Sequence, residues 1–185
     1  MCRYGFDHVT KSVEKATANF KAPTPLAVAE LPNSTLAKSI LNYATEELPL
    51  PVLNHSLRAY QYGEAILKDQ STEWAIDSDV LFSACLLHDI GTTEKNMNVT
   101  KMSFEYYGGV KARELVLKKT HGNVEFADAV CEAVIRHQDL GESGFITKLG
   151  LILQIVTVLD NLGKYTHLIH RKTLSAINKR YSREN

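Results

Sequence analysis

The stretch Leu86-Leu87-His88-Asp89-Ile90-Gly91 ends an apolar helical pattern that begins near Asp77. His88 continues the apolar stripe of that pattern, since it lies three or four residues after Ala84 and Cys85. A buried ionisable side chain is costly unless it is paired, hydrogen-bonded or bound to a metal. A histidine beside a carboxylate supplies two ligands for a divalent cation, so the remaining ligands must come from elsewhere in the chain.

Three other helical patterns carry a polar side chain where an apolar one is expected. His55 lies beside an apolar stripe, and His137 ends another. Asp160 lies four residues after Val156 and near the end of its helix, where a carboxylate is unfavourable to the helix dipole. Taken alone, His55 has an ordinary explanation as a hydrogen-bonded core histidine.

Together these positions indicate one metal site. Unpaired, each buried group would oppose folding by roughly several kcal/mol, whereas one cation satisfies two imidazoles and two carboxylates at the same time. The mixed nitrogen and oxygen ligands favour zinc, iron, manganese or cobalt over calcium. We therefore predict one metal ion per chain, held by His55, His88, Asp89 and Asp160.

The periodicity predicts an all-α domain, a bundle of about six or seven helices, because no segment alternates as a strand does. Residues 1–32 are expected to form an extended N-terminal arm on the domain of residues 33–185, since Pro23, Pro25 and Pro32 disfavour a helix. A short helix from Thr10 to Phe20 is expected within the arm. The helices of the domain are expected within residues 33–48, 51–70, 77–89, 103–118, 123–137, 147–162 and 173–180.

Glycines mark the expected ends and crossings of these helices. Gly91 is expected to end its helix in the left-handed conformation, and Gly163 is expected to stop the helix of residues 147–162. Gly108 and Gly109 lie inside a helix, which indicates a close helix crossing or a kink. Residues 92–101 are polar and are expected to form a loop, either in contact with substrate or as a solvated connection.

The composition is that of an ordinary one-domain protein, with 185 residues of which 44% are hydrophobic and 23% charged. The 21 Lys and Arg balance the 21 Asp and Glu, so no overall charge directs the chain to nucleic acid or to a membrane surface. No apolar run reaches the roughly 20 residues of a membrane-spanning helix, and the first residues lack the apolar core of a secretory signal. Cys2, Cys85 and Cys131 form no CxxC pair, which indicates reduced thiols. We expect a cytoplasmic protein, with the nucleus left open as a second location.

The order His…His-Asp…Asp on helices resembles the HD-domain superfamily of metal-dependent enzymes, and the match is carried by His55, His88, Asp89 and Asp160. The amino-acid sequence around these residues also resembles that of fungal cyanamide hydratases of the DNA-damage-inducible type. That resemblance extends over nearly the whole chain. It is carried by residues 51–58, 85–90, 101–109, 135–139, 149–155 and 157–161.

This resemblance implies zinc as the cofactor and the hydration of cyanamide, a small molecule, to urea. The zinc ion would lower the pKa of a bound water toward neutrality. Asp89 would be both a ligand of the zinc and a catalytic residue. His137 would donate the proton that the nitrile nitrogen needs or would hold the substrate, because imidazole titrates near neutral pH. Thr157 and Asn161 lie one helical turn apart beside Asp160 and would hydrogen-bond the substrate. A narrow pocket would exclude larger molecules.

Three alternatives stay open at this point. An HD-type phosphohydrolase acting on a nucleotide needs cations for phosphate, for which Arg58, Lys95 and Arg136 are the candidates. A binuclear site needs both His121 and His137 as ligands, which is disfavoured because His121 lies in a turn sequence. The third alternative is a catalytically impaired helical module that the metal merely stabilises.

The C-terminus bears on that last alternative. Relatives continue beyond Ser182-Arg183-Glu184-Asn185, whereas this chain ends there. All of the expected ligands precede that point, so we expect an intact metal site in a domain that is shortened at its C-terminus. The missing stretch would cover the site, support the core or join subunits, which leaves a homo-oligomer open.

Overall fold

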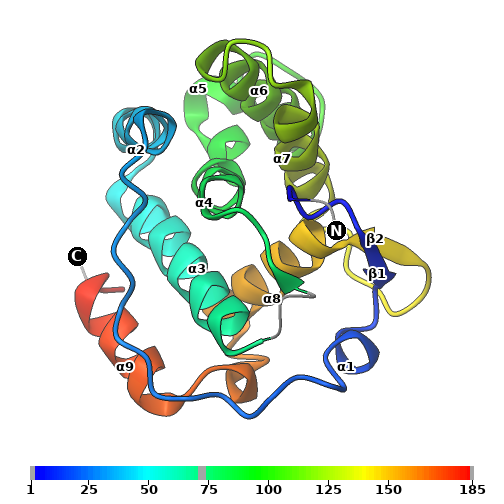
Figure 1. Cartoon of the computed structure of the whole chain (residues 1–185). Helices are drawn as coiled ribbons and strands as arrows, with labels where there is room; N and C mark the ends of the chain where they lie inside the picture. Colours follow the sequence, from blue (N-terminus) through cyan, green and yellow to red (C-terminus); the bar gives the residue numbers. More distant parts are fainter. Residues whose placement is uncertain (1–2, 71–73, 184–185) are drawn as a thin grey trace.

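The computed structural model of the protein describes residues 3–70 and 74–183 (Figure 1). Within these residues the regular secondary structure is almost entirely helical, which confirms the predicted all-α class and the count of about six or seven main helices. Seven helices have ten residues or more: α2 (Thr35–Glu47), α3 (Leu50–Asp69), α4 (Ser78–Leu87), α6 (Phe104–Lys119), α7 (Val124–Arg136), α8 (Lys148–Leu162) and α9 (Arg171–Arg180).

The shorter elements connect these helices or belong to the N-terminal arm. None of the helices in the described part of the chain has the length and hydropathy that crossing a membrane requires. The short helical turns are α1 (Val13–Ala16), η2 (Ile90–Thr92), α5 (Glu94–Met97) and η3 (Thr166–Leu168), and the two strands are β1 (His8–Thr10) and β2 (Phe145–Thr147).

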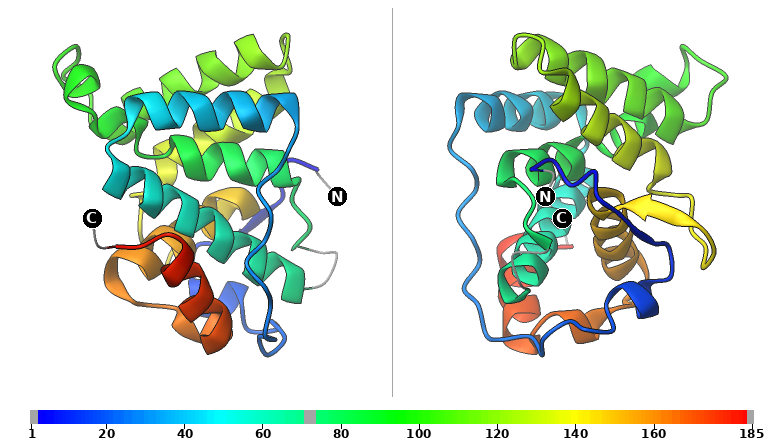
Figure 2. Two further views of the ribbon diagram at one scale, coloured as in Figure 1. Left: turned by 90° about the vertical axis from the view of Figure 1, so that its left-hand side faces the viewer. Right: turned by 45° about the vertical axis from the view of Figure 1, so that its right-hand side comes forward.

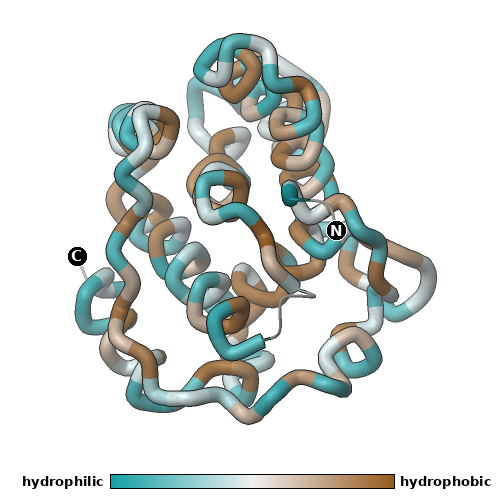
Figure 3. Tube along the Cα trace, in the orientation of Figure 1, coloured by the Kyte–Doolittle hydropathy of each residue, from teal (hydrophilic) through white to brown (hydrophobic). Residues whose placement is uncertain are grey.

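Helix α4 lies at the centre of the bundle, between α3 and α7 (Figure 1). Every residue from Val80 to Leu87 is buried, as expected for a helix that is apolar on all sides. Helix α3 also packs against α8, and α7 packs against α6 and α8. The hydrophobic residues accordingly concentrate where these helices face one another (Figure 3). The end of α4 therefore places His88 deep inside the protein.

The two strands form a small antiparallel sheet that the sequence did not predict. His8 pairs with Thr147, and Thr10 pairs with Phe145. Strands of three residues are too short to show a period of two over a useful length, so the search for that period did not find these segments. The helix predicted from Thr10 to Phe20 was also too long, because Thr10 belongs to β1 and only residues 13–16 are helical.

The rest of the arm runs in an extended path along the outside of the bundle from α1 to α2 (Figures 1 and 2). Side chains of the helices take the place of a partner strand. The amide of Gln61 on α3 accepts a hydrogen bond from the backbone N–H of Ala29 and donates one to its carbonyl. Thr173 on α9 bonds both backbone groups of Leu26 in the same way. The arm is thus attached to two different helices.

The glycines have different roles. Gly163 ends α8, as predicted, and its φ is 67°. Gly91 was wrongly predicted to be left-handed. It lies within η2, and a Cβ atom there would come within 2.0 Å of the carbonyl oxygen of Phe104. On α6, a Cβ atom at Gly109 would come within 2.6 Å of Ile135 on α7. The close crossing predicted at the glycine pair is therefore confirmed.

The segment predicted as a polar loop is partly helical. The hydroxyl of Thr93 caps α5 by accepting from the N–H of Asn96. The Asn96 side chain is buried, and its amide donates to the carbonyl of Ile90 at 2.7 Å. This segment is therefore attached to η2 beside the end of α4.

Candidate metal centre

The predicted site residues come together at one end of α3, α4, α7 and α8. His55 lies in the first half of α3, whereas His88 and His137 are the C-terminal caps of α4 and α7. Asp160 lies in the last turn of α8. All of these side chains are buried, and Asp89, which follows His88, is half-buried. The packing of these four helices thus brings side chains that are distant in the sequence to one place.

Three of these residues form a compact group of potential metal ligands, the one such group found in residues 3–70 and 74–183. The Nε2 atoms of His55 and His88 are 3.1 Å apart. The carboxylate oxygen Oδ2 of Asp89 lies 3.2 Å from Nε2 of His88 and 3.7 Å from Nε2 of His55. Two imidazole nitrogens and one carboxylate oxygen thus face a common point.

The hydrogen bonds on the other side of each ring show why this group suits a cation. Nδ1 of His88 lies 2.7 Å from the carbonyl oxygen of Cys85, and Nδ1 of His55 lies 2.7 Å from a carboxylate oxygen of Asp160. These oxygens can only accept, so each Nδ1 carries a hydrogen, and in the neutral form of each ring the Nε2 atom presents a lone pair. Two lone pairs that face each other at 3.1 Å are unfavourable unless a proton or a metal ion lies between them.

The electrostatics of the group agree with this interpretation. Burial disfavours a charged His88, but the adjacent Asp89 carboxylate outweighs that effect and raises the pKa of His88 above its usual value. Burial alone would raise the pKa of Asp89. The nearby imidazoles, first of all His88, instead hold the pKa of that carboxyl below its usual range. The group therefore attracts positive charge, and its nitrogen and oxygen donors fit a transition metal such as zinc.

His137 lies behind this group and has an unused nitrogen. Its Nδ1 donates to the carbonyl of Val134 at 2.6 Å, so its Nε2 is an acceptor. That Nε2 atom is buried, has no hydrogen-bond partner among the described residues and lies 3.8 Å from Oδ1 of Asp89. Burial, together with the nearby positive charge of His88, lowers the pKa of His137 to about 4. The ring is therefore neutral near pH 7.

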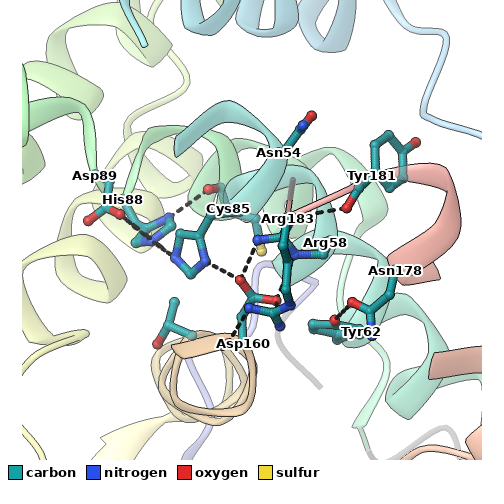
Figure 4. A network of polar contacts seen from close by, with 12 residues as sticks. Asn54, Arg58, Tyr62, Cys85, His88, Asp89, Asp160, Asn178, Tyr181 and Arg183 are labelled. Carbon is teal, nitrogen blue, oxygen red and sulfur yellow. Dashed lines mark hydrogen bonds and ion pairs between the residues drawn. The ribbon is translucent and has the colours of Figure 1, made fainter. Parts of the chain in front are cut away.

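Asp160 is arranged differently from the ligand that the sequence predicted. Its carboxylate lies on the Nδ1 side of His55, away from the Nε2 atoms, and it is not part of the compact group. Arg58 on α3 binds it in a bidentate ion pair, with both N–O distances at 2.8 Å (Figure 4). Burial would raise the pKa of Asp160, but Arg58 and His55 hold it below the usual range. In this structure the carboxylate orients the His55 ring.

A pocket of about 350 Å³ leads to the site. Of the two predicted substrate contacts on α8, Asn161 lines this pocket, whereas Thr157 is not among the lining residues. The Thr157 hydroxyl is buried and donates to carbonyl oxygens of its own helix. The lining residues are Pro51, Val52, His55, Arg58, Asp89, Asp160, Asn161 and Arg183.

Two arginines belong to the site in a way that the sequence analysis missed. Arg58 was considered only as a phosphate contact, although it lies three residues after His55 and hence on the same face of α3. That spacing was a usable signal for a partner of a buried carboxylate. Arg183 follows the last helix and also binds Asp160, at 2.7 Å. No local pattern distinguishes Arg183, because only the folded chain brings it to α8.

The chain is similar in sequence to known proteins over nearly its whole length. Residues 52–164, which contain every predicted site residue, match the HD domain family. Two proteins of Saccharomyces cerevisiae, named cyanamide hydratase DDI2 and cyanamide hydratase DDI3, are each 57% identical to the chain over 183 residues. The aligned region covers 99% of this chain and 81% of each relative. With this match and the grouped His55, His88 and Asp89, the chain belongs to the HD domain family of proteins.

Proposed function

We propose that this protein is a zinc-dependent hydratase that converts cyanamide to urea. The observation that carries the proposal is the convergence of His55, His88 and Asp89, with ligand atoms 3.1–3.7 Å apart, at the end of a pocket of about 350 Å³. The names of the two yeast relatives support the choice of substrate. The pocket admits a molecule as small as cyanamide, but its size alone does not select against larger ligands.

His55, His88 and Asp89 would hold the metal, with one ion per chain. When bound, zinc supplies a water of lowered pKa and an electrophilic centre for the nitrile. Asp160 fixes the tautomer of His55 by accepting its Nδ1–H, and the carbonyl of Cys85 does the same for His88. The chain thus keeps both Nε2 lone pairs directed at one point. The earlier prediction that Asp160 is itself a ligand stays a prediction, and the bonds of its carboxylate favour the orienting role.

His137 is suited to move a proton. Its Nε2 atom is neutral, buried and without a partner, so it can accept the proton of an attacking water. As the new carbon–oxygen bond forms, one π bond of the nitrile breaks and its nitrogen takes up a proton, which His137 can return from the same Nε2 atom. The resulting isourea tautomerises to urea. Asn161, at the wall of the pocket, is positioned to hydrogen-bond the amino group of cyanamide.

The nucleotide phosphohydrolase is less well supported, because the cations that it would need are already neutralised. Arg58 and Arg183 both bind Asp160. Lys95 pairs with Glu47 at 2.8 Å, and the Arg136 guanidinium lies near two carboxylates and the carbonyl of Phe145. A phosphate would have to displace one of these partners. The non-catalytic module is also disfavoured, since a purely structural metal site has no need of an open pocket that reaches its ligands.

A side-by-side assay tests the proposal. The purified chain is loaded with zinc, manganese or cobalt and is given either cyanamide or nucleoside monophosphates. We expect urea from cyanamide, with little phosphate release and poor turnover of bulkier nitriles. Phosphate release that exceeds urea release with every metal would establish the phosphohydrolase instead. A metal-loaded, folded chain without either activity would support the module.

A further inference from the structure

The C-terminal end of α7 is hydrogen-bonded to the middle of α8 through one buried side-chain amide. Gln154 is a polar residue within the otherwise apolar stretch of residues 149–156, and it is only 3% exposed. Its Nε2 atom donates to the carbonyl of Arg136 at 2.7 Å and to the carbonyl of Asp139 at 2.9 Å. An amide nitrogen carries two hydrogens, so both are used on this short segment. The two acceptors lie on either side of His137 in the chain.

The backbone at this point is weakly fixed by its own hydrogen bonds, because the last carbonyls of a helix have no partner within it. The N–H of His137 makes only a long bond, at 3.4 Å, to the carbonyl of Val134. The same carbonyl accepts from Nδ1 of the His137 ring at 2.6 Å. The ring and its own backbone therefore share one acceptor, and the place of the ring depends on the path of residues 136–139.

We propose that Gln154 is a positioning residue, which fixes the backbone on both sides of His137 and thereby holds the His137 ring beside the metal centre. This inference rests on the proposed function, in which His137 moves a proton. Nε2 of His137 lies 3.8 Å from Oδ1 of Asp89. A general base must come within about 2.6–3.2 Å of the group whose proton it takes. A misplacement of about 1 Å can cost about 100-fold in rate, so the path of the α7 end bears directly on turnover.

The competing explanation is that Gln154 only stabilises the fold, and the chain contains a matched control for it. Gln61 on α3 is likewise buried, at 1% exposed, and its amide also makes two hydrogen bonds to backbone groups, those of Ala29. Loss of either amide leaves buried backbone groups without a partner and destabilises the protein. Ala29 belongs to the N-terminal arm, so only the loss at Gln154 should reach the chemistry.

The test compares Gln154→Met with Gln61→Met in the zinc-loaded chain. Methionine is unbranched and adaptable, so it fills the space of glutamine without a hydrogen-bond donor. We expect kcat for cyanamide to fall about 10-fold or more in Gln154→Met, with KM and zinc content unchanged. Gln61→Met should keep kcat within twofold of the parent. A kcat of Gln154→Met within twofold of the Gln61→Met value would overturn the proposal, as would a loss of zinc that accounts for the lost rate.

A milder variant covers the case in which Gln154→Met does not fold. Gln154→Asn keeps the amide but withdraws it by one methylene group, so it cannot reach both carbonyls. We expect a lower kcat, an unchanged KM and a helical circular dichroism spectrum like that of the parent. A folded Gln154→Asn protein with the kcat of the parent would likewise overturn the proposal.

A second measurement does not depend on activity. The Nδ1–H hydrogen of His137 lies in a bond of 2.6 Å and should exchange slowly with solvent in the nitrogen-15 NMR spectrum of the imidazoles. Its signal is identified by its loss in His137→Gln. Exchange should be at least about 10-fold faster in Gln154→Met than in Gln61→Met, with or without zinc.

Equal exchange rates in these two variants would show that Gln154 does not hold the ring. The two proposals therefore fail separately. A parent chain that forms no urea contradicts the proposed function, whereas the exchange comparison still decides whether Gln154 positions His137.

Discussion

The two halves of the metal centre are oriented by different means. In the inner half, His88 and His137 each cap a helix and donate from Nδ1 to the carbonyl three residues earlier, on Cys85 and Val134. In the outer half, the His55 ring is oriented by Asp160, which is 105 residues away in the sequence. The inner half is therefore set by local helix geometry, and the outer half depends on the completed fold. Substitution of His88 or His137 should therefore act directly on metal binding or on the chemistry, whereas substitution of Asp160 should act through the orientation of His55 and the stability of the fold.

The largest effect is expected at the inner half. His88→Ala removes one of the two facing Nε2 atoms and should abolish stoichiometric zinc binding. The thermal stabilisation that zinc gives should disappear with it, because binding to the folded state and folding are linked. Elemental analysis and melting with and without zinc measure both effects. The exposed His167 provides the control, since His167→Ala should leave zinc content unchanged. Stoichiometric zinc in His88→Ala would remove His88 from the ligands.

The outer half should respond through stability as well as affinity. Asp160→Asn leaves the buried guanidinium of Arg58 without its counter-charge, which should lower the free energy of unfolding by about 3–5 kcal/mol. Denaturant unfolding of the zinc-free chain measures this. Asp128→Asn breaks an ion pair between half-exposed side chains and should change stability by no more than about 1 kcal/mol. Equal effects of the two substitutions would contradict a special role for the buried pair.

His137 separates chemistry from binding within the inner half. His137→Gln should keep the fold and the metal while it lowers turnover of cyanamide by ~10²-fold. Steady-state rates at saturating substrate, with zinc content measured on the same sample, provide the comparison. The exposed His121 serves as control, and His121→Gln should turn over cyanamide normally. A normal rate in His137→Gln would assign that ring to packing.

The smallest effect on stability is expected at Gly91, where η2 packs against α6 next to the inner half of the metal centre. Gly91→Ala adds a methyl group against the carbonyl of Phe104, so η2 must move away from α6, at a cost of roughly 1–3 kcal/mol. Thermal melting measures this loss of stability. The control is Gly141→Ala, because the new Cβ atom would meet only the end of the Lys11 side chain at 3.5 Å. A stable Gly91→Ala protein would show that this contact relaxes easily.

The difference between the two halves also explains how much the sequence could predict. The apolar stripes located His88 and His137 at the ends of their helices, because a stripe and its end are local features. They also located Asp160, but not the side of the His55 ring on which its carboxylate lies. The contact of Arg183 with Asp160 depends on the path of the chain after α9, which no periodicity encodes. Zinc and cyanamide came from resemblance and not from the pattern of residues.

The same distinction applies to the fold. Helix bounds were predicted to within a few residues because helix ends carry local signals. The side chains of Ser34, Asn123 and Thr147 each cap the helix that follows by accepting a hydrogen bond from an N–H of its first turn. The pairing of β1 with β2 was not predicted, since each strand has only three residues and the partners are distant. Gly91 was misinterpreted because its reason is a neighbouring helix and not its own backbone angle.

The attachment of the N-terminal arm has a consequence for the order in which the chain can fold during synthesis. The partner of β1 is made about 140 residues after His8, which at ribosomal rates of about 5–20 residues per second is a delay of roughly 7 to 30 s. Gln61 follows Ala29 by only 32 residues, so the middle of the arm can dock as soon as α3 has emerged. Residues 8–10 are therefore among the last to reach their place, and a newly made chain carries an unpaired β1 until β2 leaves the ribosome.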